Sequence, residues 1–167
     1  MTAQTLIISL FGQKASIDDE LLYAIEAIAD MSSPGLLAPV LQRLGHMHAV
    51  DKIFQGHLSG KPHGLEANWP ETTPTFGPLA ENIRQTDEWY VDYVSGISAD
   101  ALEEVLSFTF LDGKTGRMSR EEMLAHVITH DHYHRGEIGV LLPHVGAVGR
   151  RDSLAGHLHR AEPERRR

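Results

Sequence analysis

Apolar residues recur at steps of three and four along four separate stretches of this 167-residue chain. That spacing places side chains on one face of an α-helix, because each turn takes 3.6 residues. The stretches predict helices over 4–30, 35–58, 76–95 and from Ser119 to about Val145. Four long helices that must bury their apolar faces together predict an all-α, up-down-type four-helix bundle.

Local signals indicate where these helices begin and end. Ser119 followed by Glu122 predicts a capping box at the start of the last helix. Gly146 is expected to end that helix, since glycine is common just beyond a helix C-terminus. The run of Ser, Ser, Pro and Gly at 32–35 predicts a stop followed by a new start.

Two segments do not follow the helical spacing. Residues 59–78 contain four of the eight prolines and predict a loop, whose length makes it a functional candidate. Val105–Phe110 has the composition of a strand, and Asp112 and Gly113 then predict a turn. We therefore expect a small strand-like excursion before the last helix.

Length and charge limit the architecture and the partners. We expect one domain, with the bundle in residues 1–149 and a basic, solvated C-terminal tail in 150–167. The chain carries a formal charge of −8, but 20 of its 23 acidic and nine of its 15 basic residues lie in 1–149. The negative charge of residues 1–149 repels phosphate backbones, so nucleic acid is not an expected partner. No stretch approaches the ~18 apolar residues of a membrane helix, so the expectation is no membrane partner and a cytoplasmic location.

Cysteine is absent, which excludes disulfides, thiolate metal ligands and a cysteine nucleophile, whereas histidine occurs 11 times. His126, His130 and His134 follow one another at steps of four in the last predicted helix. Neighbours in this series lie one turn apart, so either pair, His126 with His130 or His130 with His134, can bind one transition metal. His132 lies two residues from its neighbours and points to another face.

A further ligand can come from a facing helix of the bundle. His46 lies four residues before Val50 and seven before Ile53, beside the apolar side of the second helix, and is predicted to face inward. His48 lies about 200° further around the helix and is predicted at the rim. A single inward-facing histidine is more often an ordinary core residue, but the partner pair favours ligation here.

The segment His130–His134 also has a superficial similarity to the H-E-x-x-H motif of zinc peptidases. Those enzymes use the glutamate as a general base toward a metal-bound water. Asp131 is one methylene shorter than that glutamate, and no substrate groove is evident from the sequence. A peptidase is therefore not favoured.

Two longer segments resemble the DinB/YfiT-like superfamily. Leu44–Phe54, which reads LGHMHAVDKIF, resembles its second-helix motif, in which an acid follows a histidine by five residues. Glu122–Gly136, which reads EMLAHVITHDHYHRG, resembles its last-helix signature H-x3-H-x2-Y-H-R-G. The resemblance covers most of the chain, including the proline-rich loop.

The resemblance implies a four-helix bundle, often dimeric, with a divalent metal held by three histidines. Carried over by position, the ligands are His46, His130 and His134. Zn²⁺ or Ni²⁺ suits ligation by nitrogen alone. Phe54 stands where the family usually has tryptophan, and Glu137 stands where glutamine or histidine is common. Neither departure removes a ligand, but Glu137 adds a negative charge near the site.

The family resemblance also implies metal-dependent transferases and isomerases that use low-molecular-weight thiols. Our hypothesis is therefore a metal-dependent enzyme that transfers such a thiol to a small-molecule electrophile, and that forms a homodimer. Two alternatives stay open. One is a non-catalytic metal-binding stress-response scaffold, and the other is a hydrolase that uses metal-bound hydroxide.

Several other residues are candidates for roles at the site. The sequence does not single out a general base, and the candidates are His48, His63, His126 and Glu137. The proline-rich loop, with His63 and Trp69, is a candidate cover. Three aromatic residues of the third helix are expected in helix packing or dimer contacts: Trp89, Tyr90 and Tyr93.

Overall fold

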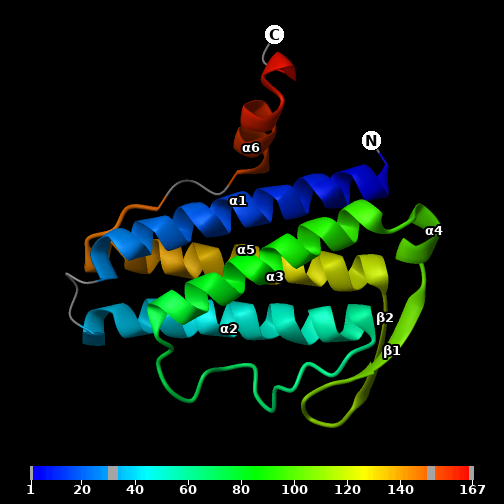
Figure 1. The fold of residues 1–167 in the computed structure, drawn as a ribbon, viewed down its shortest axis with the longest axis horizontal. Coiled ribbons are helices and arrows are strands. Elements are labelled where there is room, and N and C mark those ends of the chain that lie inside the picture. The colour runs from blue at the N-terminus through cyan, green and yellow to red at the C-terminus, as the bar shows by residue number, and fades with distance from the viewer. Residues whose placement is uncertain (1, 30–33, 150–152, 166–167) are drawn as a thin grey trace.

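The computed structural model describes residues 2–29, 34–149 and 153–165. Four long helices lie side by side in it (Figure 1): α1 (Ala3–Ala29), α2 (Pro34–Ser59), α3 (Phe76–Gly96) and α5 (Arg120–Leu141). Helix α1 packs mainly on α3, and α2 packs mainly on α5. The predicted four-helix bundle is confirmed. No helix in the described ranges has both the length and the apolar run that crossing a bilayer requires.

The direction of α3 departs from strict alternation. Helices α2 and α3 run the same way along the bundle, and α1 and α5 run the opposite way (Figure 1). The reason is the loop 60–75, which returns along the bundle before α3 begins. Sixteen extended residues reach about 50 Å, which exceeds the roughly 40 Å length of α2.

The helix ends follow the predicted signals closely. Helix α5 begins with the capping box, in which the Ser119 hydroxyl accepts from the Glu122 N–H and the Glu122 carboxylate accepts from the Ser119 N–H. Beyond Leu141 the chain continues as a 3-10 helix, η1 (Leu142–Val145), because Pro143 has no N–H to donate. Gly146 then ends it with a φ of 81°. Of the predicted break at 32–35, residues 32 and 33 lie outside the described ranges.

The predicted tail contains a helix that the sequence pattern did not indicate. Residues 153–165 form α6 (Leu154–Ala161) and a short 3-10 helix, η2 (Pro163–Arg165). Ser153 caps α6 by accepting from the Gly156 N–H, and α6 lies against α1. Residues 150–152 and 166–167 of the tail lie outside the described ranges.

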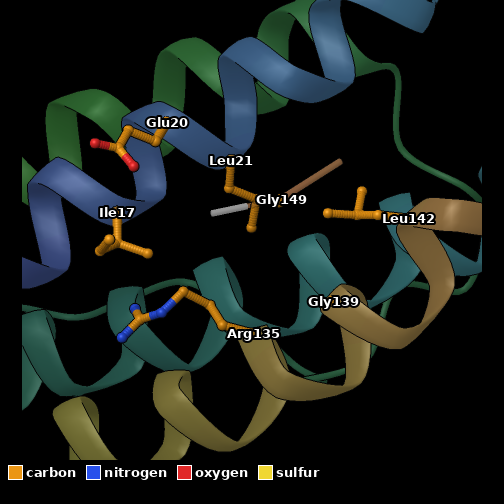
Figure 2. Close-up of a pocket in the computed structure, with 7 residues that line it drawn as sticks. All are labelled: Ile17, Glu20, Leu21, Arg135, Gly139, Leu142 and Gly149. Atoms are coloured by element: carbon orange, nitrogen blue, oxygen red, sulfur yellow. The ribbon is translucent and has the colours of Figure 1, made fainter. Parts of the chain in front are cut away.

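A small cavity of about 50 Å³ remains between α1 and α5 (Figure 2). Ile17 and Leu21 of α1 line it, together with Leu142 of η1. Gly139 of α5 also lines it, and a Cβ atom added there would meet no atom within 4 Å. A space of this size is too small for a substrate.

A short helix and a hairpin connect α3 to α5. Helix α4 (Ala99–Leu102) is followed by strands β1 (Val105–Thr109) and β2 (Thr115–Ser119), which pair antiparallel. Gly113 has a φ of 84° in the turn, a conformation that favours glycine. The predicted strand-like excursion is therefore confirmed as a β-hairpin.

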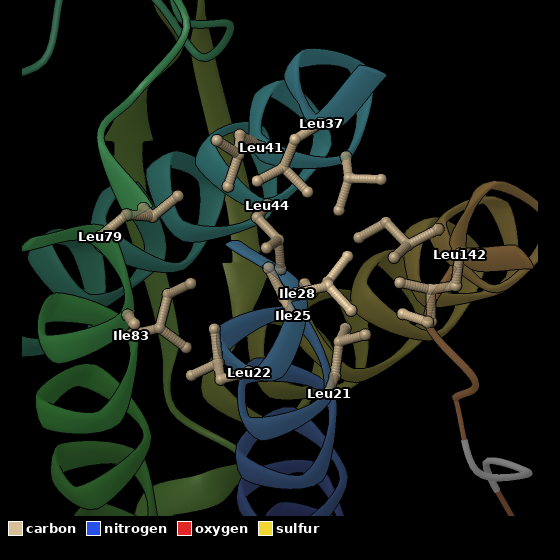
Figure 3. Packing of buried hydrophobic residues seen from close by; sticks show 14 of the residues in the cluster. Leu21, Leu22, Ile25, Ile28, Leu37, Leu41, Leu44, Leu79, Ile83 and Leu142 are labelled. Carbon is tan, nitrogen blue, oxygen red and sulfur yellow. The ribbon is translucent and has the colours of Figure 1, made fainter. Parts of the chain in front are cut away.

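The buried apolar residues form two clusters, one toward each end of the bundle. Figure 3 shows the first, which includes Leu22, Ile25 and Leu44. The second includes Phe11, Tyr90 and Met123. In α1, α3 and α5, buried charged residues lie between the positions of the two clusters, and in α2 the buried Asp51 lies next to Val50, where the second cluster begins. A charged layer thus divides the core at the middle of the bundle.

Candidate metal centre

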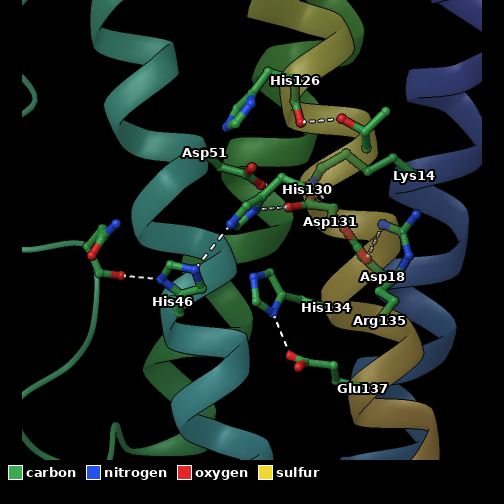
Figure 4. A network of polar contacts seen from close by, with 12 residues as sticks. Lys14, Asp18, His46, Asp51, His126, His130, Asp131, His134, Arg135 and Glu137 are labelled. Carbon is green, nitrogen blue, oxygen red and sulfur yellow. Dashed lines mark hydrogen bonds and ion pairs between the residues drawn. The ribbon is translucent and has the colours of Figure 1, made fainter. Parts of the chain in front are cut away.

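Three histidine side chains converge at the level of the charged layer (Figure 4). His46 projects from α2, whereas His130 and His134 project from successive turns of α5. The Nε2 atoms of His46 and His130 are 3.1 Å apart, and one ring nitrogen from each of the three residues lies within 4.8 Å of the others. The structure thus brings together the three residues that the family resemblance indicated.

The Nδ1 atom of each ring faces an oxygen atom outside the cluster. His46 Nδ1 donates to the carbonyl oxygen of Asn68 at 2.6 Å, and His134 Nδ1 donates to Glu137 Oε2 at 2.7 Å. His130 Nδ1 lies 3.4 Å from Asp131 Oδ1. Metal-binding histidines commonly show this arrangement, because the outer acceptor fixes the tautomer and aims Nε2 at the metal.

These outer acceptors determine which ring nitrogens carry hydrogen. A carbonyl or an ionised carboxylate has no proton to give, so Nδ1 of His46 and of His130 carries the hydrogen. When both rings are neutral, their Nε2 atoms present lone pairs to each other at 3.1 Å. Two lone pairs at that distance repel each other, and a shared cation removes the repulsion. The donor set and its orientation therefore fit a transition-metal ion.

Burial also favours the neutral form of His46. Removal from water lowers the pKa of its ring, and the neighbouring His130 and His134 lower it further, against the hydrogen bond to Asn68. A neutral imidazole is the form that binds a metal. Glu137 in turn lies 3.4 Å from Arg43 Nε, so the carboxylate lies between the His134 ring and a guanidinium cation.

A buried lysine, which the sequence pattern did not indicate, organises the charged layer. Lys14 Nζ lies 2.9 Å from carboxylate oxygens of Asp18, Asp51 and Asp131, and it also donates to Asp87. Each long helix of the bundle therefore contributes one aspartate to a single ammonium group. All five residues are buried, and only Lys14 among them carries a positive charge.

The carboxyl groups of this layer differ in pKa because their surroundings differ. Burial raises the pKa of Asp51 well above its usual value and raises that of Asp87 to about 7. Burial acts on Asp131 in the same direction, but Lys14 and the hydrogen bond to His130 outweigh it and lower its pKa to about 2. The carboxylate next to the histidines therefore stays ionised.

Asp131 connects the charged layer to the histidine cluster. Its Oδ1 faces His130 Nδ1, and its Oδ2 lies 2.9 Å from Lys14 Nζ. The side chain is fully buried and held from both sides. It therefore does not act as the base of a zinc peptidase, in agreement with the sequence interpretation. A polar residue at a core-facing position, such as Lys14 between Phe11 and Ile17, is the signal that would have revealed the layer.

The proline-rich loop reaches the site through Asn68 and Trp69. The Trp69 ring lies 4.8 Å from the His46 ring, next to the Asn68 carbonyl that holds its Nδ1. The loop passes close to α2 because residue 45 is glycine: a Cβ there would lie 2.7 Å from Pro70. His63, in contrast, lies away from the cluster, with its ring against that of His57.

A cavity of about 650 Å³ opens beside His46 and His130. Of the four candidate bases, His126 is the one that lines it. His48 lies on another face of α2, where its Nε2 is 3.2 Å from the Thr86 hydroxyl. His63 accepts from the Leu65 N–H, and Glu137 is occupied by His134.

The aromatic residues of α3 take part in helix packing, with Tyr90 buried and Trp89 and Tyr93 half-buried. Tyr90 is fully buried, and its hydroxyl donates to the Asp51 carbonyl oxygen at 2.8 Å. Trp89 and Tyr93 stack with ring centroids 4.9 Å apart, and Arg120 donates to the Tyr93 hydroxyl. These contacts hold α3 against α2 and against the start of α5.

Comparison with known proteins agrees with this architecture. The family model of the DinB superfamily matches residues 15–138, which include all three histidines of the cluster. The chain is similar in fold to a DinB-like protein from Bacillus cereus of known crystal structure, with a TM-score of 0.58 and 18% identity. That similarity covers 84% of this chain and 94% of the other. A comparison with curated proteins found no match. On the extent of the family match, this chain belongs to the DinB superfamily.

Proposed function

We propose that this chain is a divalent-metal-dependent enzyme in which His46, His130 and His134 bind a Zn²⁺ or Ni²⁺ ion. The observation that carries the proposal is the pair of Nε2 atoms, 3.1 Å apart, on rings whose Nδ1 atoms face acceptors. Ligation by three imidazole nitrogens leaves coordination positions free, which is typical of catalytic rather than structural zinc sites. Imidazole suits zinc and nickel among the divalent metals.

The reaction that we propose is the transfer of a low-molecular-weight thiol to a small electrophile. A metal bound here would supply a Lewis acid that lowers the pKa of the thiol. The thiolate sulfur forms the new bond to the electrophilic carbon, and the leaving group departs with the bonding electrons. The chain has no cysteine of its own, so a cosubstrate must bring the sulfur. The cavity beside His46 and His130 offers room for the electrophile.

The protein's own groups would hold this site in its working geometry. Asn68 and Glu137 fix two of the three rings, and Asp131 faces the third. Trp69 shields one face of His46. These contacts limit ring rotation before any ligand arrives, and such preorganisation lowers the cost of binding a metal.

A thiol-transferase assay on protein prepared without a nickel column tests the function. We expect zinc-loaded protein to conjugate one or more of a panel of low-molecular-weight thiols to an aryl halide. Chelation should abolish turnover, and added zinc should restore it. His134→Ala should reduce turnover by about 100-fold or more, whereas His132→Ala, an exposed histidine of the same helix, should leave it unchanged.

The same assay separates the two alternatives. A non-catalytic scaffold predicts that chelation lowers the melting temperature while no thiol and electrophile pair is turned over. A hydrolase predicts product without any added thiol, with a rate that rises near neutral pH. Either result would overturn the transferase proposal.

The homodimer and the cytoplasmic location stay predictions that accompany this proposal. Sedimentation of the zinc-loaded protein should give the mass of two chains. A single-chain mass at micromolar concentration would contradict the first prediction, and secretion of the chain by its source cell would contradict the second.

A further inference from the structure

Rings dominate the wall of the cavity beside His46 and His130. The hairpin contributes Phe108 and Phe110, whose ring centroids lie 4.8 Å apart. Helix α2 contributes Phe54, whose ring lies 6.3 Å from Phe108 and 4.6 Å from His126. The remaining apolar lining residues are Val50, Ile53, Leu111 and Met118.

The hairpin holds its two phenylalanines over this cavity because of one glycine. Gly116 pairs with Phe108 across the strands. A Cβ atom at Gly116 would lie 2.6 Å from both the Phe108 and the Phe110 ring. The two rings therefore lie over Gly116, and any larger residue at position 116 would displace them.

The described lining residues of this cavity include no lysine and no arginine. Its one carboxylate, Asp112, is exposed and lies 2.8 Å from Lys114 Nζ. Burial lowers the pKa of His57, and His63 adds to that effect, so the His57 ring is uncharged at neutral pH. A metal ion held by His46 and His130 would place positive charge at that side of the cavity, but the wall of Phe54, Phe108 and Phe110 has no cation of its own. The net charge of the whole chain is −8.

We propose that this cavity binds an uncharged aromatic group of the electrophilic substrate. The proposal rests on the function proposed above and names the substrate class of that site. The volume of about 650 Å³ lies within the range of small-molecule pockets and accommodates a two-ring system. Aromatic walls favour flat aromatic ligands through stacked and edge-to-face contacts. An anionic group buried against these rings would lose its hydration with no lysine or arginine of the described lining to replace it.

Two ligands of nearly equal shape test the proposal: 2-naphthyl methyl sulfone, which is uncharged, and 2-naphthalenesulfonate, which is an anion. Both are weak metal ligands, so calorimetric titration of the full-length, zinc-loaded protein compares their fit to the cavity. We expect the sulfone to bind with a dissociation constant at least tenfold lower. Equal or tighter binding of the sulfonate would overturn the proposal.

Lysine substitutions locate the binding. Phe110→Lys places a cation in the lining at a residue that is half exposed, and Leu111→Lys does so at the neighbouring position. Each should reduce the preference for the sulfone at least tenfold. Val140→Lys adds the same charge at an exposed position of α5 that does not line the cavity, and should leave the preference within twofold. Equal shifts in all three variants would place the binding elsewhere.

The outcome is independent of the thiol-transferase assay. Selective sulfone binding without any thiol turnover would support the cavity assignment and overturn the proposed function. Thiol turnover that prefers anionic over uncharged aromatic electrophiles would support the proposed function and overturn the cavity assignment.

Discussion

At the scale of single residues, the site depends on the acceptors behind the histidines as much as on the histidines. Asn68, Asp131 and Glu137 each face an Nδ1 atom and so determine where Nε2 points. The sequence indicated the three histidines through their spacing and the family motifs. It treated Glu137 as an added charge and a candidate general base, because its contact with His134 depends on side-chain geometry that a pattern does not contain.

Removal of the Glu137 carboxylate should weaken metal binding. Glu137→Ala leaves His134 free to rotate and to change tautomer, so we expect zinc affinity to fall by about 10- to 100-fold. Competition with a chromophoric chelator measures it. Glu88→Ala, which removes the same charge from an exposed position of α3, is the control. Equal affinity of the two variants would contradict the role of Glu137.

Lys14→Met should destabilise the fold strongly. The substitution leaves four buried aspartates without their shared cation, and breaking a buried ion pair typically costs about 3–5 kcal/mol. Urea unfolding at pH 8 measures the loss. The loss should be smaller at pH 5, where more of the carboxyl groups take up protons. A variant as stable as the wild type at pH 8 would disprove this account of Lys14.

Asp87 should make stability fall as pH rises from 5 to 8. Burial raises its folded pKa to about 7, whereas an unfolded aspartate has a pKa of about 3.9. Within this window the folded chain binds a proton that the unfolded chain does not, so deprotonation favours unfolding. Asp87→Asn lacks this penalty. The difference in unfolding free energy between Asp87→Asn and the wild type should therefore shift by about 2–3 kcal/mol in favour of the variant from pH 5 to pH 8. A constant difference in urea unfolding free energy, measured with chelator present, would show that Asp87 titrates normally.

At the scale of elements, apolar spacing predicted the helices well because each buries one face, and strand-type composition followed by a turn signal predicted the hairpin. The start of α5 at Ser119 and the turn at Gly113 follow from local capping and turn preferences. The same logic missed Lys14, because a charged residue in a helical pattern is normally assigned to the surface. It also missed α6, which spans only eight residues and buries none of them, so its apolar pattern rests on Leu154 and Leu158 alone.

Two glycine substitutions should change stability in opposite directions. Gly139→Ala adds a methyl group where no atom lies within 4 Å and improves helix propensity, so unfolding free energy should rise by about 0.5–1 kcal/mol. Gly116→Ala places the same group 2.6 Å from two phenylalanine rings and should destabilise by about 1–3 kcal/mol. Thermal and urea unfolding of both variants tests the pair, and a stabilised Gly116→Ala would contradict the packing of the hairpin.

At the scale of the whole molecule, the core consists of two apolar halves with a charged layer between them. The histidine cluster lies at the level of this layer and is connected to it through Asp131. The bundle itself could be predicted from periodicity, but the parallel course of α2 and α3 could not. That course depends on where the loop 60–75 lies, and its Pro and Gly residues specify a loop without specifying its path.

The central claim is that His46, His130 and His134 share one metal ion. Elemental analysis of protein purified without a nickel column, after equilibration with zinc and removal of free metal, tests it most directly. We predict one zinc per chain in the wild type and in His48→Ala, whose side chain lies on another face of α2. We predict less than about 0.1 zinc per chain in His46→Ala. Equal zinc content in His46→Ala and His48→Ala, or no zinc in the wild type, would contradict the claim.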